Sequence, residues 1–436
     1  MSIKNNVVKI IGAGLAGCEC ALFLAKHGVN VELYEMKPEK KTPAHKSNDF
    51  AELVCSNSLK SKDKLTASGL LKQELEVLDC SLLKIANLTC VQAGSALAVD
   101  RNLFAKMVTE KINQNKNIKV INKCVETFDK NDNLIIATGP LTDEKLYKNL
   151  SNLIGEQNCY FYDAIAPIIS TESIDMNIAF WGNRYNKGDS EGDYLNLPLN
   201  KEQYLNFYNE LVKAKRVELK DFEKVFESCM AVEVLAKRGV DALRFGPMKP
   251  VGFNLEKKPY AVVQLRKENT EGTSVNMVGF QTNLLFPEQS RVFKKIPGLE
   301  NAEFLRYGQM HRNSYINAPE CLTRFSSLKK FPNIFVAGQL SGVEGYMESI
   351  ASGLYVGYNM LCFLNKKTHN PLPDTTCLGA IISYITSASV ASFQPMNANY
   401  GIIKVEKPIK DKVQKREYIL NNSLYEIKKW REEIWK

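Results

Sequence analysis

The sequence predicts an α/β fold in which a Rossmann-type dinucleotide-binding domain is interrupted by an inserted α+β domain. Residues 12–17 read G-A-G-L-A-G and follow a short apolar run. Two later apolar runs, 134–137 and 334–337, also end close to a glycine. Between these two runs, strand-like segments such as 260–265 and 274–280 carry no glycine fingerprint. Their alternating pattern favours a separate domain.

The N-terminal segment has the pattern of a dinucleotide-binding βαβ unit. Periodicity predicts its three elements: a strand at 7–11, a helix at 18–26 and a strand at 29–34. Gly12 makes the tight turn, Gly14 lets backbone amides approach a pyrophosphate, and Gly17 lets the helix pack on the strand. Glu35, at the end of the second strand, is placed to accept hydrogen bonds from ribose hydroxyls.

The two later strand ends favour FAD over NAD as the bound dinucleotide. Two-dinucleotide flavoproteins return to the same nucleotide with a strand that ends in A-T-G and a final strand that ends in glycine before a helix. Here 133–139 reads N-L-I-I-A-T-G and 333–345 reads N-I-F-V-A-G-Q-L-S-G-V-E-G. The second segment aims a helix N-terminus at the flavin, where it stabilises negative charge. No second G-x-G-x-x-G is present, so NADH or NADPH is expected to bind transiently.

These patterns divide the chain into four segments. We predict an FAD-binding domain in two parts, 1–165 and 329–403, an inserted substrate- or RNA-facing domain at 166–328, and a basic helical tail at 404–436. The tail has ten Lys and Arg against six Asp and Glu, with aromatic residues at near-helical spacing. That pattern is typical of a closing amphipathic helix.

Composition excludes several classes of protein. With 436 residues, 44% hydrophobic and 24% charged, the chain is neither disordered nor a single small domain. The net charge of +9 permits an anionic partner such as nucleic acid without requiring one. Eleven cysteines without a C-x-x-C pair, and no secretory pattern, predict free thiols in the cytoplasm. The stretch 345–364 contains Glu348, so no membrane span is expected, and the four histidines lack metal-ligand spacing, so no metal is expected.

Two cysteines and two polar segments are candidates for chemistry. Cys55 lies in A-E-L-V-C-S-N-S-L, where a turn or helix start can lower a thiol pKa, and Cys229 lies in F-E-S-C-M-A-V-E-V-L-A-K-R-G. Each is equally open to being an inert thiol. From Lys237 to Lys267 there are eight Lys and Arg against two acids, with aromatics between them, which suits either RNA or a solvated face. M-H-R-N at 310–313 either holds an anion or caps a helix.

The combined motifs closely resemble the folate- and FAD-dependent RNA uracil-5 methyltransferases, from residue 7 to about 401. The blocks that carry the resemblance include L-Y-E-M-K-P, F-A-E-L-V-C-S-N-S-L, A-L-A-V-D-R, C-M-x-x-E-V-x-A-K-R-G, F-G-P-M-K-P-V-G and A-G-Q-L-S-G-V-E-G-Y. The resemblance implies transfer of the one-carbon unit of 5,10-methylenetetrahydrofolate, reduced by NADH or NADPH through FAD, to C5 of a uridine. The implied target is the T-loop uridine of tRNA, with 23S ribosomal RNA as the alternative.

The resemblance also implies roles for individual residues. Cys229 resembles the nucleophile that adds to C6 of uracil, and Cys55 resembles the second functional thiol near the flavin, although the division of labour between them stays open. The implied FAD contacts are Gly12, Gly14, Leu15, Gly17, Glu35, Met36, Gly139, Gly338, Gln339, Glu344, Gly345 and Tyr346. The implied folate or RNA contacts are His311, Arg312, Phe286, Lys237 and Arg238, with segment 281–289 beside the folate.

One segment departs from the family pattern. Family members read F-Q-T-H-L-K-W-G where this chain reads F-Q-T-N-L-L-F-P, so Asn283, Phe286 and Pro287 replace a histidine, a tryptophan and a glycine. Phe286 retains a smaller stacking face.

Three other functions stay open at this stage. One is the related flavoprotein family that modifies the wobble uridine of tRNA with a partner GTPase, although this chain lacks a long helical C-terminal domain. The others are a non-catalytic flavin-bearing RNA-binding protein and an NAD(P)H:thiol oxidoreductase. We expect a cytoplasmic protein with no membrane contact and no obligate protein partner.

Overall fold

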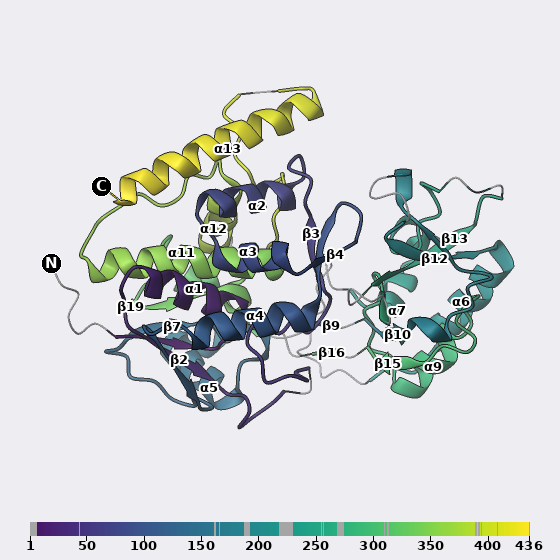
Figure 1. Cartoon of the computed structure of the whole chain (residues 1–436), viewed down its shortest axis with the longest axis horizontal. Helices are drawn as coiled ribbons and strands as arrows, with labels where there is room; N and C mark the ends of the chain where they lie inside the picture. Colours follow the sequence, from purple (N-terminus) through teal and green to yellow (C-terminus); the bar gives the residue numbers. More distant parts are fainter. Residues whose placement is uncertain are drawn as a thin grey trace.

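The computed structural model forms two lobes of unequal size (Figure 1). It describes residues 7–42, 44–160, 163–164, 166–186, 192–217, 230–253, 255, 257–267, 274–308, 310–311, 314–388, 390, 393, 395–407 and 409–435. The larger lobe contains the N-terminal and C-terminal parts of the chain, and the smaller lobe contains its middle. We refer to them as the first and second lobes.

The first lobe is built on a six-stranded sheet with the order β18-β19-β7-β1-β2-β6. Its strands are β1 (Val8–Ile11), β2 (Val31–Glu35), β6 (Ile118–Asn122), β7 (Asn133–Ile136), β18 (Ser327–Leu328) and β19 (Phe331–Val336). Five of them are parallel, and β18 is antiparallel to β19. Ile136 pairs with both Ile11 and Val336, so the turns after β1, β7 and β19 meet at one edge of the sheet. The predicted Rossmann-type α/β class is confirmed.

Two helices cover one face of this sheet beside the shared edge. They are α1 (Leu15–Lys26) and α11 (Tyr346–Leu364). A Cβ added to Gly353 of α11 would lie 2.7 Å from Cα of Ala16, so glycine lets the two backbones approach closely. The remaining helices of the lobe are α2 (Ala67–Val77), α3 (Ser81–Leu88), α4 (Arg101–Asn113), α5 (Glu144–Ile154), α10 (Ala318–Cys321), α12 (Cys377–Ser387) and α13 (Lys412–Trp435). A small sheet of β3 (Ser58–Ser61), β4 (Cys90–Val91) and β5 (Ala96–Val99) completes it.

The second lobe is a six-stranded antiparallel sheet packed against short helices. Its strand order is β11-β12-β13-β14-β10-β15. These strands are β10 (Ile168–Ser170), β11 (Phe180–Gly182), β12 (Tyr194–Leu199), β13 (Ala261–Lys267), β14 (Ser274–Met277) and β15 (Phe304–Arg306). The helices are α6 (Lys201–Lys213), α7 (Val232–Ala236), α8 (Ala242–Phe245) and α9 (Phe286–Phe293). A separate hydrophobic core runs from Ile169 to Phe304, and the first core resumes at Tyr315.

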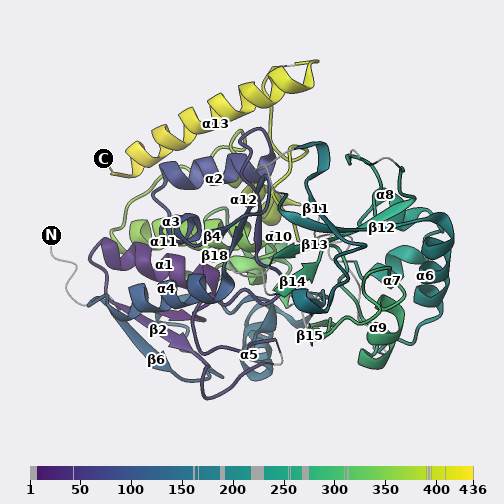
Figure 2. The same ribbon diagram turned by 45° about the vertical axis from the view of Figure 1, so that its right-hand side comes forward.

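Two short strand pairs join the lobes, and the last helix packs on the first lobe. The pairs are β8 (Cys159–Tyr160) with β17 (Tyr315–Ile316) and β9 (Asp163–Ala164) with β16 (Met310–His311). Helix α13 lies along α2 in both views (Figures 1 and 2). It buries Ile419, Leu420, Ile427 and Trp430, because these apolar side chains recur at helical spacing. Among the described residues, no helix has the length and apolar character needed to cross a membrane.

Candidate functional site

The turn between β1 and α1 requires glycine at two positions and leaves open space at a third. Gly12 has φ 103°, and a Cβ there would lie 2.6 Å from the carbonyl oxygen of Ala137. A Cβ at Gly17 would overlap the carbonyl oxygen of Gly12. Gly14, in contrast, has φ −78° and no protein atom within 4 Å of an added Cβ. The first two glycines therefore serve packing, and Gly14 borders a space that a ligand can fill.

Glu35 is held in a fixed orientation at the end of β2. Its side chain is 6% exposed. One carboxylate oxygen accepts the N–H of Ala13 at 3.1 Å, and the other accepts the N–H of Lys37 at 3.0 Å. Each oxygen keeps a lone pair for a further donor. A carboxylate in this position suits the ribose hydroxyls of a dinucleotide.

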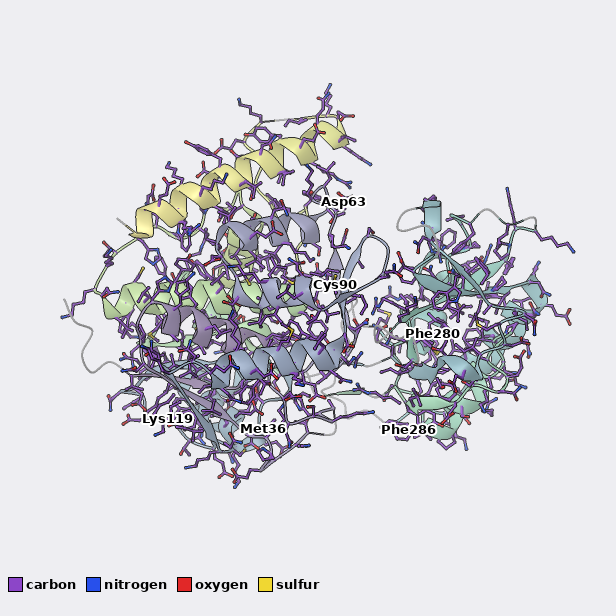
Figure 3. All side chains as sticks on the ribbon, in the orientation of Figure 1. Met36, Asp63, Cys90, Lys119, Phe280 and Phe286 are labelled. Carbon is purple, nitrogen blue, oxygen red and sulfur yellow. The ribbon has the colours of Figure 1, made fainter. Side chains whose placement is uncertain are left out.

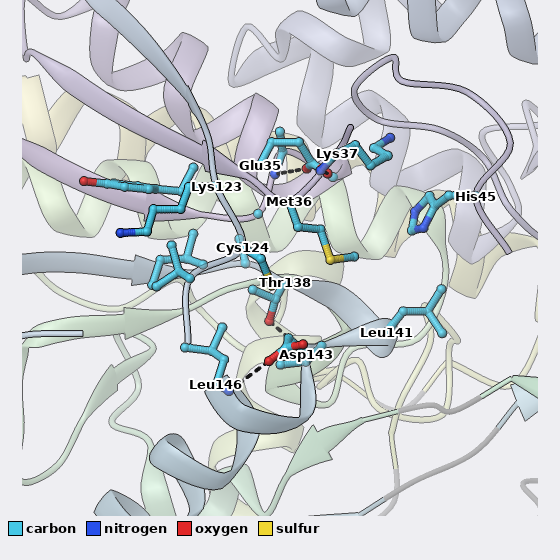
Figure 4. Close-up of a pocket in the computed structure, with 18 of the residues that line it drawn as sticks. Glu35, Met36, Lys37, His45, Lys123, Cys124, Thr138, Leu141, Asp143 and Leu146 are labelled. Carbon is cyan, nitrogen blue, oxygen red and sulfur yellow. Dashed lines mark hydrogen bonds between the residues drawn. The ribbon is translucent and has the colours of Figure 1, made fainter. Parts of the chain in front are cut away.

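A first cavity opens beside Glu35 and Met36 (Figure 4). It encloses about 610 Å³, part of which is open to solvent. Figure 4 shows Met36, Lys37 and His45 above the cavity and Thr138, Asp143 and Leu146 below it. Its lining also includes Gly12, Gly14, Glu52, Lys123 and Ala137. The ends of β1, β2 and β7 thus supply one wall, as the nucleotide end of a dinucleotide site requires.

A second, larger cavity of about 1470 Å³ continues from the first. The two share Gly14, His45, Glu52, Ala137, Thr138 and Leu141. Predicted cofactor residues that line the second cavity are Gly14, Leu15, Gly139, Gly338, Gln339, Glu344, Gly345 and Tyr346. Cys55 and Gln281 also line it. The shared residues make one continuous trough, whose two ends fit the adenosine and flavin halves of FAD.

His45 lies where the two cavities meet, in positively charged surroundings. Burial lowers its pKa to about 4, and the charges of Lys37, Arg306 and Lys41 act in the same direction. Its Nδ1 forms a hydrogen bond with the hydroxyl of Thr42 at 2.7 Å. The imidazole is therefore neutral at pH 7, while the cations around it favour an anion. The pyrophosphate of a dinucleotide matches this charge.

The turn that carries Cys55 is fixed by Tyr346, the first residue of α11. The Tyr346 hydroxyl oxygen accepts the N–H of Cys55 at 2.7 Å and the N–H of Ser56 at 3.2 Å. Burial is the main cause of the raised pKa of Tyr346, and the nearby Cys55 raises it further. The phenol therefore stays protonated at pH 7, with its oxygen used as an acceptor. Cys55 itself is half-buried and borders the flavin end of the trough.

The same turn is bound from the other side by the second lobe. Asn57, which is fully buried, accepts a hydrogen bond from Nε of Arg266 at 2.9 Å. Its amide also donates to the carbonyl oxygen of Lys267 at 2.7 Å. Both partners lie on β13. Residues 55–57 are thus held between α11 of the first lobe and β13 of the second, so the position of Cys55 depends on both lobes.

The predicted substrate residues are distributed over the second lobe. Lys237 and Arg238 are exposed, directly after α7. Phe286 is 44% exposed and stacks on Tyr307, with ring centroids 5.0 Å apart and planes at 16°. Figure 3 places it at the edge of the second lobe, and it lines neither cavity. Asn283 is buried and donates its amide to the carbonyl oxygen of Val217, so this departure from the family pattern serves a local loop contact.

Three further predictions fall partly or wholly outside the described residues. Cys229 and Arg312 lie outside the residues that the structure describes. His311 pairs through its backbone with Asp163. In the part of the chain that is described, no three His, Cys, Asp or Glu side chains gather so that they could hold a metal ion.

The structure adds site residues that the sequence reasoning did not single out. They are His45 and Lys60, together with Lys37, Glu52 and Thr138, which lie within quoted motifs without an assigned role. Lys60 lines the flavin end, and its ammonium pairs with the buried carboxylate of Glu348 at 2.8 Å. The signal available in the sequence was proximity to the fingerprint strands, because Lys37 lies two residues after Glu35 and Thr138 directly precedes Gly139.

Comparisons with known proteins agree with this geometry. A family model described as glucose inhibited division protein A matches residues 7–368. A protein of Acetivibrio thermocellus named methylenetetrahydrofolate--tRNA-(uracil-5-)-methyltransferase TrmFO is 54% identical over 95% of both chains. Proteins of the same name from Caldicellulosiruptor bescii and Thermotoga maritima are 52% and 48% identical. They cover 96% and 98% of this chain and 97% and 99% of their own.

A solved structure shows the same fold. Aquifex aeolicus GidA in its form II crystal superposes with a TM-score of 0.71 at 15% identity, over 100% of this chain and 74% of that chain. At this identity the likeness concerns the fold alone, whereas the family and the named relatives concern the sequence. The resemblance expected from the motifs is confirmed. The chain belongs to the glucose inhibited division protein A family and, within it, to the TrmFO group of methylenetetrahydrofolate--tRNA-(uracil-5-)-methyltransferases.

Proposed function

We propose that this chain is a flavoprotein methyltransferase that moves the one-carbon unit of 5,10-methylenetetrahydrofolate to C5 of a uridine in tRNA, with NADH or NADPH as the reductant. The observation that carries the proposal is the 54% identity, over 95% of both chains, to a relative with that activity in its name. The two-part trough supports it, because its dimensions and lining fit an extended dinucleotide. When bound, FAD supplies the two-electron carrier between the nicotinamide and the one-carbon unit.

The residues along the trough have separate tasks in this proposal. Glu35 holds the ribose, and the open space at Gly14 admits the pyrophosphate to the N-terminus of α1. The cations around His45 compensate the phosphate charge. Tyr346 lies at the flavin end and fixes the backbone at Cys55. The folate belongs beside the flavin, where Gln281 reaches the cavity from the second lobe.

The two thiols keep the roles that the resemblance implies. We assign Cys229 as the nucleophile that adds to C6 of uracil, which makes C5 able to accept the one-carbon unit. The described residues after it support this, because the N–H of Val232 donates to the carbonyl oxygen of Gln281 at 2.7 Å. Glu233 fixes the same segment, accepting the hydroxyl of Thr282 and the N–H of Asn283, each at 2.8 Å. Cys55, at the cavity wall, is assigned as the second functional thiol.

The names of the same relatives support the choice of target. All three relatives carry tRNA in their names, which favours tRNA over 23S ribosomal RNA. We propose a cytoplasmic location, supported by the free state of nine cysteines.

The experiment supplies the purified protein with NAD(P)H and methylenetetrahydrofolate labelled in its methylene carbon. Unmodified tRNA and 23S RNA fragments are offered in separate reactions, and label in 5-methyluridine is measured. Label in tRNA is the expected result, and label in the ribosomal fragment alone would reassign the substrate. Cys229→Ala should abolish labelling while FAD stays bound. Retained labelling in this variant would remove Cys229 from the nucleophile role.

A further inference from the structure

The second lobe exposes an aromatic side chain to an unusual degree. Phe245, the last residue of α8, is 86% exposed, the highest value among the large apolar side chains that the structure describes. The helix buries Leu243 instead. Full burial of a phenylalanine stabilises a fold by roughly 1.5–3 kcal/mol, so this position forgoes most of that stabilisation. A single exposed apolar residue is common, and what surrounds Phe245 decides whether it has a function.

Cations surround Phe245. We define the basic–aromatic face by seven exposed residues of this region: Lys237, Arg238, Phe245, Lys249, Val251, Lys257 and Lys258. Among the described residues of 230–260, the exposed acid is Asp241, and it is paired with Arg244 at 2.5 Å. Glu233 is buried. The face is therefore complementary in charge to a polyanion.

Packing contacts bring the parts of this face together. A Cβ added to Gly246 would lie 3.2 Å from Leu235, which places the end of α7 beside the end of α8. The guanidinium of Arg244 lies 3.7 Å above the ring of Tyr260 and donates to its carbonyl oxygen at 2.9 Å. This contact fixes α8 against the start of β13. The cations that follow α7 and those that precede β13 thus flank the same short helix.

Short chain segments connect the face to the flavin end of the trough. A Cβ added to Gly279 would lie 2.7 Å from Cβ of Pro247, two residues after Phe245. Two residues after Gly279, Gln281 lines the larger cavity. An exposed tyrosine extends the face on its other side, because Tyr185, 61% exposed, donates its N–H to the carbonyl oxygen of Gly252. The face and the cavity wall are thus linked through Pro247 and the segment 279–281.

We propose that Phe245 is a stacking platform for an unpaired base of the RNA substrate, and that Lys237, Arg238 and Lys249 bind the phosphates on either side of that base. The inference rests on the proposed function and names a contact for its substrate. An aromatic face between cations is how proteins hold single-stranded or loop nucleotides. A second copy of this chain is disfavoured, because a two-fold contact would bring the same cations together.

The test compares Phe245→Ala and Phe245→Trp with Leu88→Ala. Leu88 is 73% exposed at the end of α3, on the first lobe, and serves as the matched control. Binding of an unmodified tRNA transcript to the FAD-loaded protein is measured by fluorescence anisotropy. Phe245→Ala should raise the Kd about 5- to 150-fold, Phe245→Trp should keep tight binding, and Leu88→Ala should have no effect. Lys249→Ala should reduce the slope of log Kd against log salt concentration by about one, whereas Phe245→Ala should leave this slope unchanged.

Three results would overturn the inference. They are an unchanged Kd in Phe245→Ala, an equal loss in Leu88→Ala, and a changed oligomeric state of Phe245→Ala in sedimentation, which would make the face a protein interface. The labelling assay distinguishes a failure of the Phe245 inference from a failure of the proposed function. Wild-type protein that binds tRNA but incorporates no label would refute the methyltransferase activity, while the comparison of Kd values would still decide the role of Phe245.

Discussion

Replacing Gly14 by alanine should weaken FAD binding and leave the fold intact. At φ −78° and ψ −169° the backbone conformation is open to any residue, and an added Cβ meets no protein atom within 4 Å. Alanine as N-cap of α1 destabilises by roughly 0.5–1 kcal/mol. Reduced freedom of the unfolded chain stabilises by roughly 0.4–1 kcal/mol. The two effects oppose each other, so the free energy of unfolding of the FAD-free protein should change by less than about 1 kcal/mol.

The same methyl group should weaken FAD binding, because it occupies the space through which backbone amides approach the pyrophosphate. Overfilling a close contact costs about 1–3 kcal/mol, which corresponds to a rise in Kd of about 5- to 150-fold. Titration of the FAD-free protein with FAD, followed by flavin fluorescence, measures the affinity. Urea unfolding of the same preparations measures the stability.

Two other glycines provide the controls. Gly401 is exposed, lies outside both cavities and has no left-handed φ, and an added Cβ would meet the side-chain oxygen of Asn399 at 3.0 Å. Gly401→Ala should therefore leave the FAD affinity unchanged. Gly17→Ala should lower the stability, because its Cβ overlaps the carbonyl oxygen of Gly12. An unchanged FAD affinity in a folded Gly14→Ala protein would refute the placement of the dinucleotide at this turn.

Three further predictions concern the Cys55 turn and a buried carboxylate. Asn57→Ala leaves Nε of Arg266 without its acceptor and should lower the free energy of unfolding by about 1–3 kcal/mol; an unchanged urea midpoint would contradict the contact. Tyr346→Phe removes the acceptor of the Cys55 N–H and should slow methyl transfer while FAD stays bound. Flavin absorbance measures the bound FAD, and the labelling assay measures the rate. A wild-type rate in this variant would show that the Tyr346 hydroxyl has no role in the reaction. Burial raises the pKa of Glu74 to about 7, so between pH 4.5 and 7 the folded state retains a proton that the unfolded chain has lost, and stability falls as pH rises. In urea unfolding, Glu74→Gln should reduce the loss of unfolding free energy over this pH range by up to about 3 kcal/mol. Parallel pH profiles of the variant and the wild type would exclude a raised pKa of Glu74 as the cause.

The part of the site that could be predicted from the sequence is the part built by local geometry. Gly12, Gly17 and Glu35 lie within one βαβ unit, where the spacing of glycines and the strand end determine the contacts. It was also predictable that Gly139 and Gly338 lie at the same site, because parallel strands that end in glycine meet at one sheet edge. In each case a short motif contains the whole physical reason.

The contacts that fix Cys55 could not be predicted in this way. Its partner Tyr346 is 291 residues away along the chain, and Asn57 and Arg266 are 209 residues apart. No periodicity connects such pairs, because they depend on how the two lobes are placed. The position of Phe286 was equally hidden, since its stacking on Tyr307 depends on the local packing of the second lobe. Side chains at a junction between lobes are determined by tertiary packing.

This junction has a consequence for the reaction. Most of the trough belongs to the first lobe, but Gln281 reaches it from the second, and the Asn57 contact with β13 lies two residues from Cys55. A rotation of the second lobe would therefore move Gln281 and pull on the Cys55 turn together. Asn57 is a buried side chain through which β13 of the second lobe holds this turn, so Asn57→Ala should separate the two movements.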